Sequence, residues 1–164
     1  MPKAGLAAFV LLVAGLGGGA VAGEKVTFPG ARADGYAHAE VVSAELQMPQ
    51  DAKGKVPAVV ILHGSGGIDG RGQFHAEALN EAGFATLEVF MFARGQRPRE
   101  GGMATLTHGF GALKYLAGRP DIDSGKIGVM GFSFGANMTL RMASKAVSEA
   151  FLPNADDPRF AAHA

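Results

Sequence analysis

The sequence predicts an α/β fold in which a mostly parallel sheet carries helices on both faces. Short apolar runs, typical of buried strands, occur at residues 58–62, 85–89 and 127–130. Stretches with helical spacing, at residues 74–82 and 104–117, separate these runs. Because a strand, a helix and a second strand form a right-handed crossover, this alternation places the strands side by side in one sheet.

Length and composition agree with a single globular domain. Of the 164 residues, 48% are hydrophobic and 18% are charged, a balance typical of chains that form a core. Lysine plus arginine number 15, as do aspartate plus glutamate, so no net charge favours nucleic acid or an anionic membrane surface. Cysteine is absent, which excludes disulfides, thiolate catalysis and cysteine-ligated metal sites.

The first 22 residues have the features of a signal peptide. Lys3 supplies a positive charge, residues 6–16 form an apolar core, and residues 20–22 (Ala-Val-Ala) are a small-x-small cleavage pattern. The alternative is a membrane-spanning helix, but the apolar segment is short and ends in several glycines. We therefore expect export to the periplasm or the medium, and a mature domain of residues 23–164 without stable membrane insertion.

The first expected strands precede a glycine-rich loop. Residues 40–48 roughly alternate apolar and polar side chains, which favours a strand near the edge of the sheet with one solvent-exposed face. Residues 58–62 are an unbroken apolar run, typical of a strand buried on both faces. Residues 63–67, His-Gly-Ser-Gly-Gly, follow it directly.

The later elements complete the alternation. Helical spacing over residues 74–82 places Phe74 and Ala78 on one side, and an irregular loop rich in arginine and glycine covers residues 90–102. After the helix at 104–117 and the strand at 127–130, we expect one helix over residues 136–147 and the start of another strand at 159–164.

Residues 131–135, Gly-Phe-Ser-Phe-Gly, fit the Gly-x-Ser-x-Gly pattern of a nucleophile elbow between a strand and a helix. A serine hydroxyl is a weak nucleophile unless a turn presents it to a base. The turn is sharp enough only if its flanking positions lack side-chain bulk, hence the two glycines. Ser133 is therefore the candidate nucleophile.

The loop at residues 63–67 and Ser133 both follow strands, and ligands of such sheets bind at the carboxyl ends of the strands. Acyl transfer passes through an oxyanion that backbone N–H groups stabilise. We predict that the N–H of Phe134 and the N–H of Ser65 or Gly66 are these donors. The alternative, a phosphate-binding loop, lacks the expected Walker or dinucleotide pattern.

Residues 59–67 (VVILHGSGG), 92–95 (FARG) and 128–135 (GVMGFSFG) together resemble the dienelactone hydrolase family of α/β-hydrolases, over nearly all of residues 40–164. The resemblance implies an α/β-hydrolase fold and hydrolysis of a small carboxylic ester or lactone, through an acyl-enzyme on Ser133, with no cofactor and no metal. The best-known members carry cysteine at the nucleophile position, and serine departs from that pattern.

The same resemblance gives roles to two further residues. Arg94 matches an arginine that helps bind a substrate carboxylate, although it could instead be an exposed loop charge. His63 matches a position that shapes the oxyanion loop rather than one that acts as a base.

The triad of this fold runs Ser, then Asp or Glu, then His along the chain. After Ser133 the candidates are Asp156 and Asp157, in an expected loop, and His163, in an expected strand, and none fits the order and spacing. We therefore expect the chain to be the amino-terminal part of a hydrolase, without its C-terminal strands and inactive alone. Two alternatives stay open: a non-catalytic binding or scaffold protein on the same fold, and a peptidase or lipase.

Overall fold

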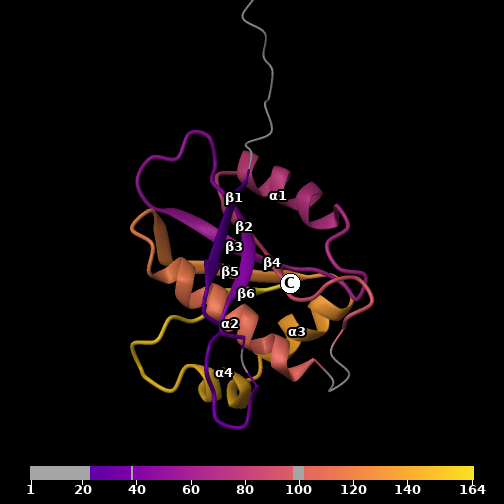
Figure 1. Cartoon of the computed structure of the whole chain (residues 1–164). Coiled ribbons are helices and arrows are strands. Elements are labelled where there is room, and N and C mark those ends of the chain that lie inside the picture. Colours follow the sequence, from indigo (N-terminus) through magenta and orange to yellow (C-terminus); the bar gives the residue numbers. More distant parts are fainter. Residues whose placement is uncertain (1–22, 38, 98–101) are drawn as a thin grey trace, which may run out of the picture.

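A six-stranded sheet is the centre of this computed structural model, which describes residues 23–37, 39–97 and 102–164 (Figure 1). The signal peptide predicted for residues 1–22 lies outside the described residues. The strands lie in the order β1-β2-β4-β3-β5-β6. Their bounds are β1 Glu24–Phe28, β2 Val42–Gln47, β3 Val56–Leu62, β4 Ala85–Phe90, β5 Ile122–Gly131 and β6 Ala162–His163.

The sheet is mostly parallel, as the alternation of elements predicts. β3 runs parallel to β4 on one side and to β5 on the other, and β5 runs parallel to β6. β2 pairs antiparallel with both β4 and β1. β1 is a strand that the sequence analysis did not predict, and it covers the outer side of β2.

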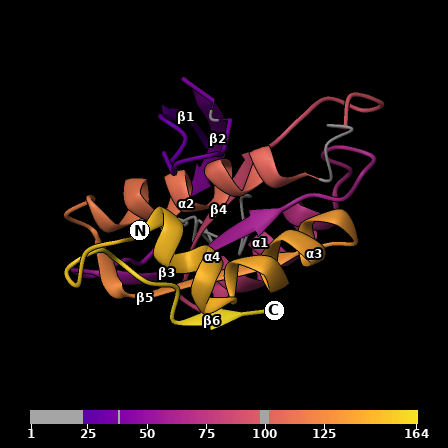
Figure 2. The same cartoon turned by 90° about the horizontal axis from the view of Figure 1, so that it is seen from below.

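Helices cover both faces of the sheet, which confirms the expected layers. Figure 1 shows the strands between α1 on one side and α2, α3 and α4 on the other, and Figure 2 shows these three helices on the near face. The helix bounds are α1 Arg71–Glu81, α2 Met103–Ala117, α3 Phe134–Met142 and α4 Lys145–Phe151. None of the helices in the described part of the chain is long and apolar enough to cross a membrane.

The core lies mainly between the sheet and α2. The apolar residues of α2 that recur at helical intervals are fully buried: Leu106, Phe110, Leu113 and Leu116. The ring of Phe110 stacks on the ring of Phe151 from α4, with centroids 4.6 Å apart. This contact fixes α4 against α2.

The apolar residues Phe74 and Ala78 of helix α1 do not face the sheet. Phe74 and Ala78 are exposed, Phe74 by 69%, whereas Gly72 and Ala76 are buried. The predicted helix is present, and polar side chains of α1 contact the sheet. Gln73 accepts a hydrogen bond of 2.8 Å from Gln47 on β2, so a polar layer separates α1 from this part of the sheet.

The helix predicted over residues 136–147 is two helices. α3 ends at Met142, and Ser144 has extended backbone angles (φ −67°, ψ 127°) that no helix contains. The break redirects the chain so that Phe151 reaches the core. The strand predicted at residues 159–164 is present as the short β6, which pairs with β5 through Gly128 and Val129.

Candidate active site

A sharp turn at Ser133 joins β5 to α3. Ser133 has φ 52° and ψ −104° and is the one non-glycine residue with positive φ in the described ranges. Such angles are costly for a residue with a side chain and persist only where the surrounding structure enforces them. The turn leaves the Ser133 side chain exposed at the carboxyl end of β5.

Close packing explains the two glycines of the motif. A β-carbon added at Gly131 would lie 2.6 Å from the backbone nitrogen of Ala136. One added at Gly135 would lie 2.7 Å from the carbonyl carbon of Leu62 and 2.8 Å from the carbonyl oxygen of His63. Both positions therefore touch backbone that cannot rotate away, so the turn needs glycine at each.

The same packing brings the turn against β3 and the glycine-rich loop at residues 63–67, which we call the oxyanion loop. The N–H of Phe132 donates a 3.1 Å hydrogen bond to the carbonyl of Leu62. A β-carbon at Gly64 would lie 3.7 Å from the β-carbon of Ser133. The two motifs thus adjoin, as their positions after neighbouring strands predict.

The backbone N–H groups of the predicted oxyanion donors make no backbone hydrogen bond within the described part of the chain. The Phe134 N–H lies in the first turn of α3, where helix N–H groups have no partner within the helix. Among the described residues, no backbone hydrogen bond uses the N–H of Ser65 or Gly66, although the loop is closed by a 3.1 Å bond from the Gly67 N–H to the Gly64 carbonyl. The arrangement can therefore receive an anionic oxygen next to Ser133.

His63 fixes the oxyanion loop and cannot act as a base in this arrangement. Its Nε2 accepts a 3.0 Å hydrogen bond from the N–H of Met91, and its Nδ1 lies 2.8 Å from the Gly64 carbonyl. Because a carbonyl only accepts, Nδ1 must carry the proton and the ring is neutral. Burial lowers the pKa of His63, which keeps it neutral.

The structure places Arg94 beside the oxyanion loop through its backbone. A β-carbon at Gly67 would lie 3.4 Å from the Arg94 nitrogen, and the Arg94 side chain is exposed. Its proposed contact with a substrate carboxylate stays a prediction.

The Arg97 side chain contacts two residues of the site. Its Nη1 donates a 3.3 Å hydrogen bond to the Ser65 hydroxyl, and its Cζ lies 5.7 Å from the centroid of the Phe134 ring. The sequence analysis places Arg97 only within an irregular loop rich in arginine and glycine, at residues 90–102. No spacing or motif distinguishes it from the other arginines of that loop.

A second guanidinium lies on the other side of Ser133. The Cζ of Arg71, at the start of α1, is 5.5 Å from the centroid of the Phe132 ring. Arg71 is paired with Asp69, which accepts a 2.9 Å hydrogen bond from its Nε. The two phenyl rings that flank Ser133 therefore each contact an arginine, of which one is neutralised.

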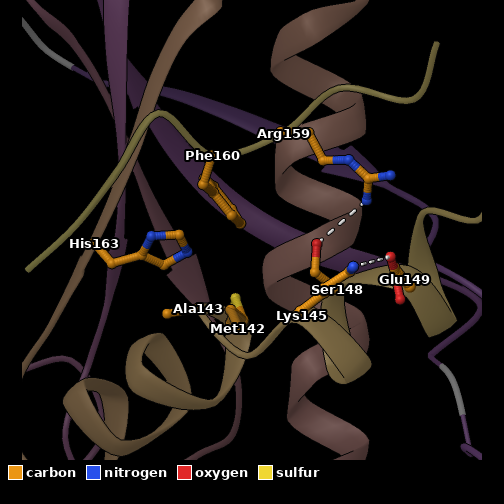
Figure 3. Close-up of a pocket in the computed structure, with 8 residues that line it drawn as sticks. All are labelled: Met142, Ala143, Lys145, Ser148, Glu149, Arg159, Phe160 and His163. Carbon is orange, nitrogen blue, oxygen red and sulfur yellow. Dashed lines mark hydrogen bonds and ion pairs between the residues drawn. The ribbon is translucent and has the colours of Figure 1, made fainter. Parts of the chain in front are cut away.

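No described side chain hydrogen-bonds the Ser133 hydroxyl. His163 lies elsewhere, next to Phe160 in a cavity of about 330 Å³ between the C-terminal end of α3, α4 and β6 (Figure 3). Its partner in register on β5 is Val129, four residues before Ser133. Asp157 accepts a 2.8 Å hydrogen bond from the Asn154 N–H, as a loop residue.

The residues described also contain no group of three or more His, Cys, Asp or Glu side chains that could hold a metal ion.

Residues 42–153 match the model of the family described as "Dienelactone hydrolase family". The chain belongs to the dienelactone hydrolase family. The oxyanion loop and the nucleophile elbow both lie within the matched residues.

Relatives of this family member share its fold over part of their length. It is 30% identical over 103 residues to the peroxisomal succinyl-coenzyme A thioesterase of Mus musculus, covering 63% of this chain and 24% of the mouse protein. A bacterial heroin esterase superposes with a TM-score of 0.55 at 21% identity, over 73% of this chain and 39% of the esterase. A dienelactone hydrolase-like promiscuous phosphotriesterase from metagenomic libraries superposes with a TM-score of 0.54 at 20% identity, over 74% of this chain and 54% of the phosphotriesterase.

These comparisons show the α/β-hydrolase fold that the sequence predicts. The dienelactone hydrolase family member spans about a quarter of the length of the mouse relative and up to about half of the two solved structures.

Proposed function

We propose that this chain supplies the nucleophile and the oxyanion hole of a serine hydrolase that cleaves a small carboxylic ester or lactone. The observation that carries the proposal is the strained, exposed Ser133 beside the oxyanion loop. Membership of a hydrolase family and likeness to proteins named as esterases and a thioesterase support it.

The chemistry would proceed in two steps. The Ser133 Oγ attacks the carbonyl carbon while its proton passes to a base, and the base then gives this proton to the leaving oxygen as the carbon–oxygen bond breaks, which leaves an acyl-enzyme. Water hydrolyses the acyl-enzyme and restores the serine. The N–H groups of Phe134 and of Ser65 or Gly66 would stabilise each oxyanion, a contribution of about 10²–10³ in kcat for one donor.

The described residues do not include a base for Ser133. His63 is held neutral by two backbone groups, and the described residues provide no other partner to the Ser133 hydroxyl. We propose that the histidine and the acid of the triad come from residues other than those described. Arg94 is the proposed ligand of a substrate carboxylate, and export through residues 1–22 remains part of the proposal.

A fluorophosphonate probe tests the nucleophile directly, because it reacts only with an activated serine. The protein should be isolated from the cells that make it and labelled as wild type, Ser133→Ala and Ser124→Ala, the last being an exposed serine at the other end of β5. We expect labelling of wild type and Ser124→Ala, with the mass of the adduct on the peptide that contains Ser133.

Loss of labelling in Ser133→Ala alone supports the proposal. Absence of labelling in the folded wild type favours a non-catalytic binding protein on the same fold. The intact mass measured in the same experiment shows whether the active species exceeds the 16.8 kDa of residues 1–164 and whether residues 1–22 have been removed.

A further inference from the structure

The loop that follows β4, residues 91–97, contacts the oxyanion loop at three places, and we call it the support loop. The Met91 N–H binds His63, whose ring also meets the Phe92 ring edge-on at 4.8 Å. The Arg94 backbone packs on Gly67, with 3.4 Å between its nitrogen and a β-carbon placed there. The Arg97 side chain hydrogen-bonds Ser65, in the middle of the oxyanion loop.

The support loop also contacts the other half of the proposed oxyanion hole. The Phe134 ring lies between Phe92, at 5.2 Å between centroids, and the guanidinium of Arg97, at 5.7 Å. Arg97 is therefore a described side chain that contacts both Ser65 and Phe134, through a hydrogen bond to the hydroxyl of one and a cation–π contact with the ring of the other. These two residues carry two of the N–H groups proposed to bind the oxyanion.

We propose that Arg97 is a positioning residue that holds the oxyanion loop at a fixed distance from the first turn of α3. This inference rests on the proposed serine hydrolase function. A guanidinium suits the task because it is planar, stacks on an aromatic ring and still donates from its edge, whereas an ammonium is a compact point charge. A loop free to move by about 1 Å can lower the rate of a reaction 10²-fold, since the donors no longer meet the oxyanion.

Charge adds to this role. None of the ion pairs between described residues includes Arg97, whereas Arg71 on the opposite side of Ser133 is paired with Asp69. Among the described residues, no carboxylate therefore pairs with the positive charge of Arg97 next to the proposed oxyanion hole. Because the side chain is exposed, solvent and salt screen this charge, and positioning is the larger part of the effect.

The test uses the protein as its own cells make it, with the uncharged ester p-nitrophenyl acetate, so that a carboxylate-binding role has no influence. The variants are Arg97→Gln, Arg97→Lys, Ser65→Ala, which keeps the backbone N–H, and the double variant Ser65→Ala/Arg97→Gln. The control is Arg32→Gln, an exposed arginine in the connection between β1 and β2. Kcat and KM are measured with the rate of fluorophosphonate labelling and the thermal midpoint.

We expect Arg97→Gln to lower kcat and the labelling rate about tenfold, with KM and the thermal midpoint little changed, because positioning acts on the transition state. Arg97→Lys should be almost as slow. Since Ser65 and Arg97 act as one unit, the double variant should be no slower than Arg97→Gln. Arg32→Gln should match the wild type.

Three results overturn the inference. Unchanged kcat in Arg97→Gln excludes a positioning role, full activity of Arg97→Lys shows that charge alone acts, and a rise in KM alone identifies a substrate contact instead. In each of these cases labelling of Ser133 in the wild type leaves the proposed function standing. A folded wild type that neither labels nor turns over the ester overturns the proposed function and this inference with it.

Discussion

Gly135→Ala is the substitution that tests the elbow geometry most directly. Its new β-carbon would lie 2.7 Å from the carbonyl carbon of Leu62, 2.8 Å from the carbonyl oxygen of His63 and closer still to the Leu62 oxygen. Non-bonded carbon atoms prefer separations of about 3.5–4.0 Å. All three contacts are with backbone, so relief requires α3 to move away from β3.

Two opposing terms set the size of the effect. Overpacking of a well-packed site costs about 1–3 kcal/mol, occasionally more, and this site is at the upper end because no side chain can rotate aside. Alanine is favoured over glycine inside a helix by about 1 kcal/mol. The expected net loss is therefore about 2 kcal/mol, which for a chain of this size corresponds to a fall in Tm of roughly 4–8 °C.

Thermal and urea unfolding followed by circular dichroism measure this loss. The matched control is Gly118→Ala, at the C-terminal cap of α2, where φ is −80° and the nearest atom to a new β-carbon is the Lys114 carbonyl oxygen at 3.5 Å. It should be neutral or stabilising by about 0.4–1 kcal/mol. A Gly135→Ala protein as stable as Gly118→Ala would refute the packing argument and with it the reason given for the second glycine of the motif.

Three further predictions concern the rest of the fold. Burial, followed by nearby carboxylates, raises the pKa of Glu88, so its ionised form destabilises the folded state, and Glu88→Gln should raise the urea midpoint at pH 8 but not at pH 4. Burial lowers the pKa of His63, so the unfolded chain binds the proton more tightly, and the free energy of unfolding should fall as the pH drops below about 6.5. His63→Asn should weaken this pH dependence. At pH 8 the same substitution should cost about 1–3 kcal/mol because hydrogen bonds are lost. Phe151→Ala should cost about 3–5 kcal/mol in urea unfolding because the ring is fully buried on Phe110, whereas the exposed Phe74→Ala should stay within about 0.5 kcal/mol; equal losses would contradict the core assignment.

The parallel strands and the elbow were predictable because their signals are local. The apolar runs at 58–62 and 85–89 lie in β3 and β4. The glycines on either side of Ser133 are required by backbone contacts within the motif and with β3. β1 was missed because its five residues carry only two buried side chains, Val26 and Phe28, too few to define an alternation.

Other features depend on contacts between distant segments, which periodicity does not report. The orientation of α1 follows from hydrogen bonds such as the one between Gln47 and Gln73, 26 residues apart. The break between α3 and α4 follows from the need to bury Phe151. Arg97 stands out only after the fold places Ser65 and Phe134 on either side of it.

The contact of Gly135 with Leu62 also determines when the turn at Ser133 can form during synthesis and folding. Ser133 holds its positive φ only while α3 is pressed against β3, a strand that ends 71 residues earlier in the chain. The turn therefore cannot form until α3 has been synthesised, because it needs both β3 and α3 in place. If Ser133 is the nucleophile, as proposed, it should react with a fluorophosphonate only in the folded chain, so labelling would report completed folding as well as catalysis.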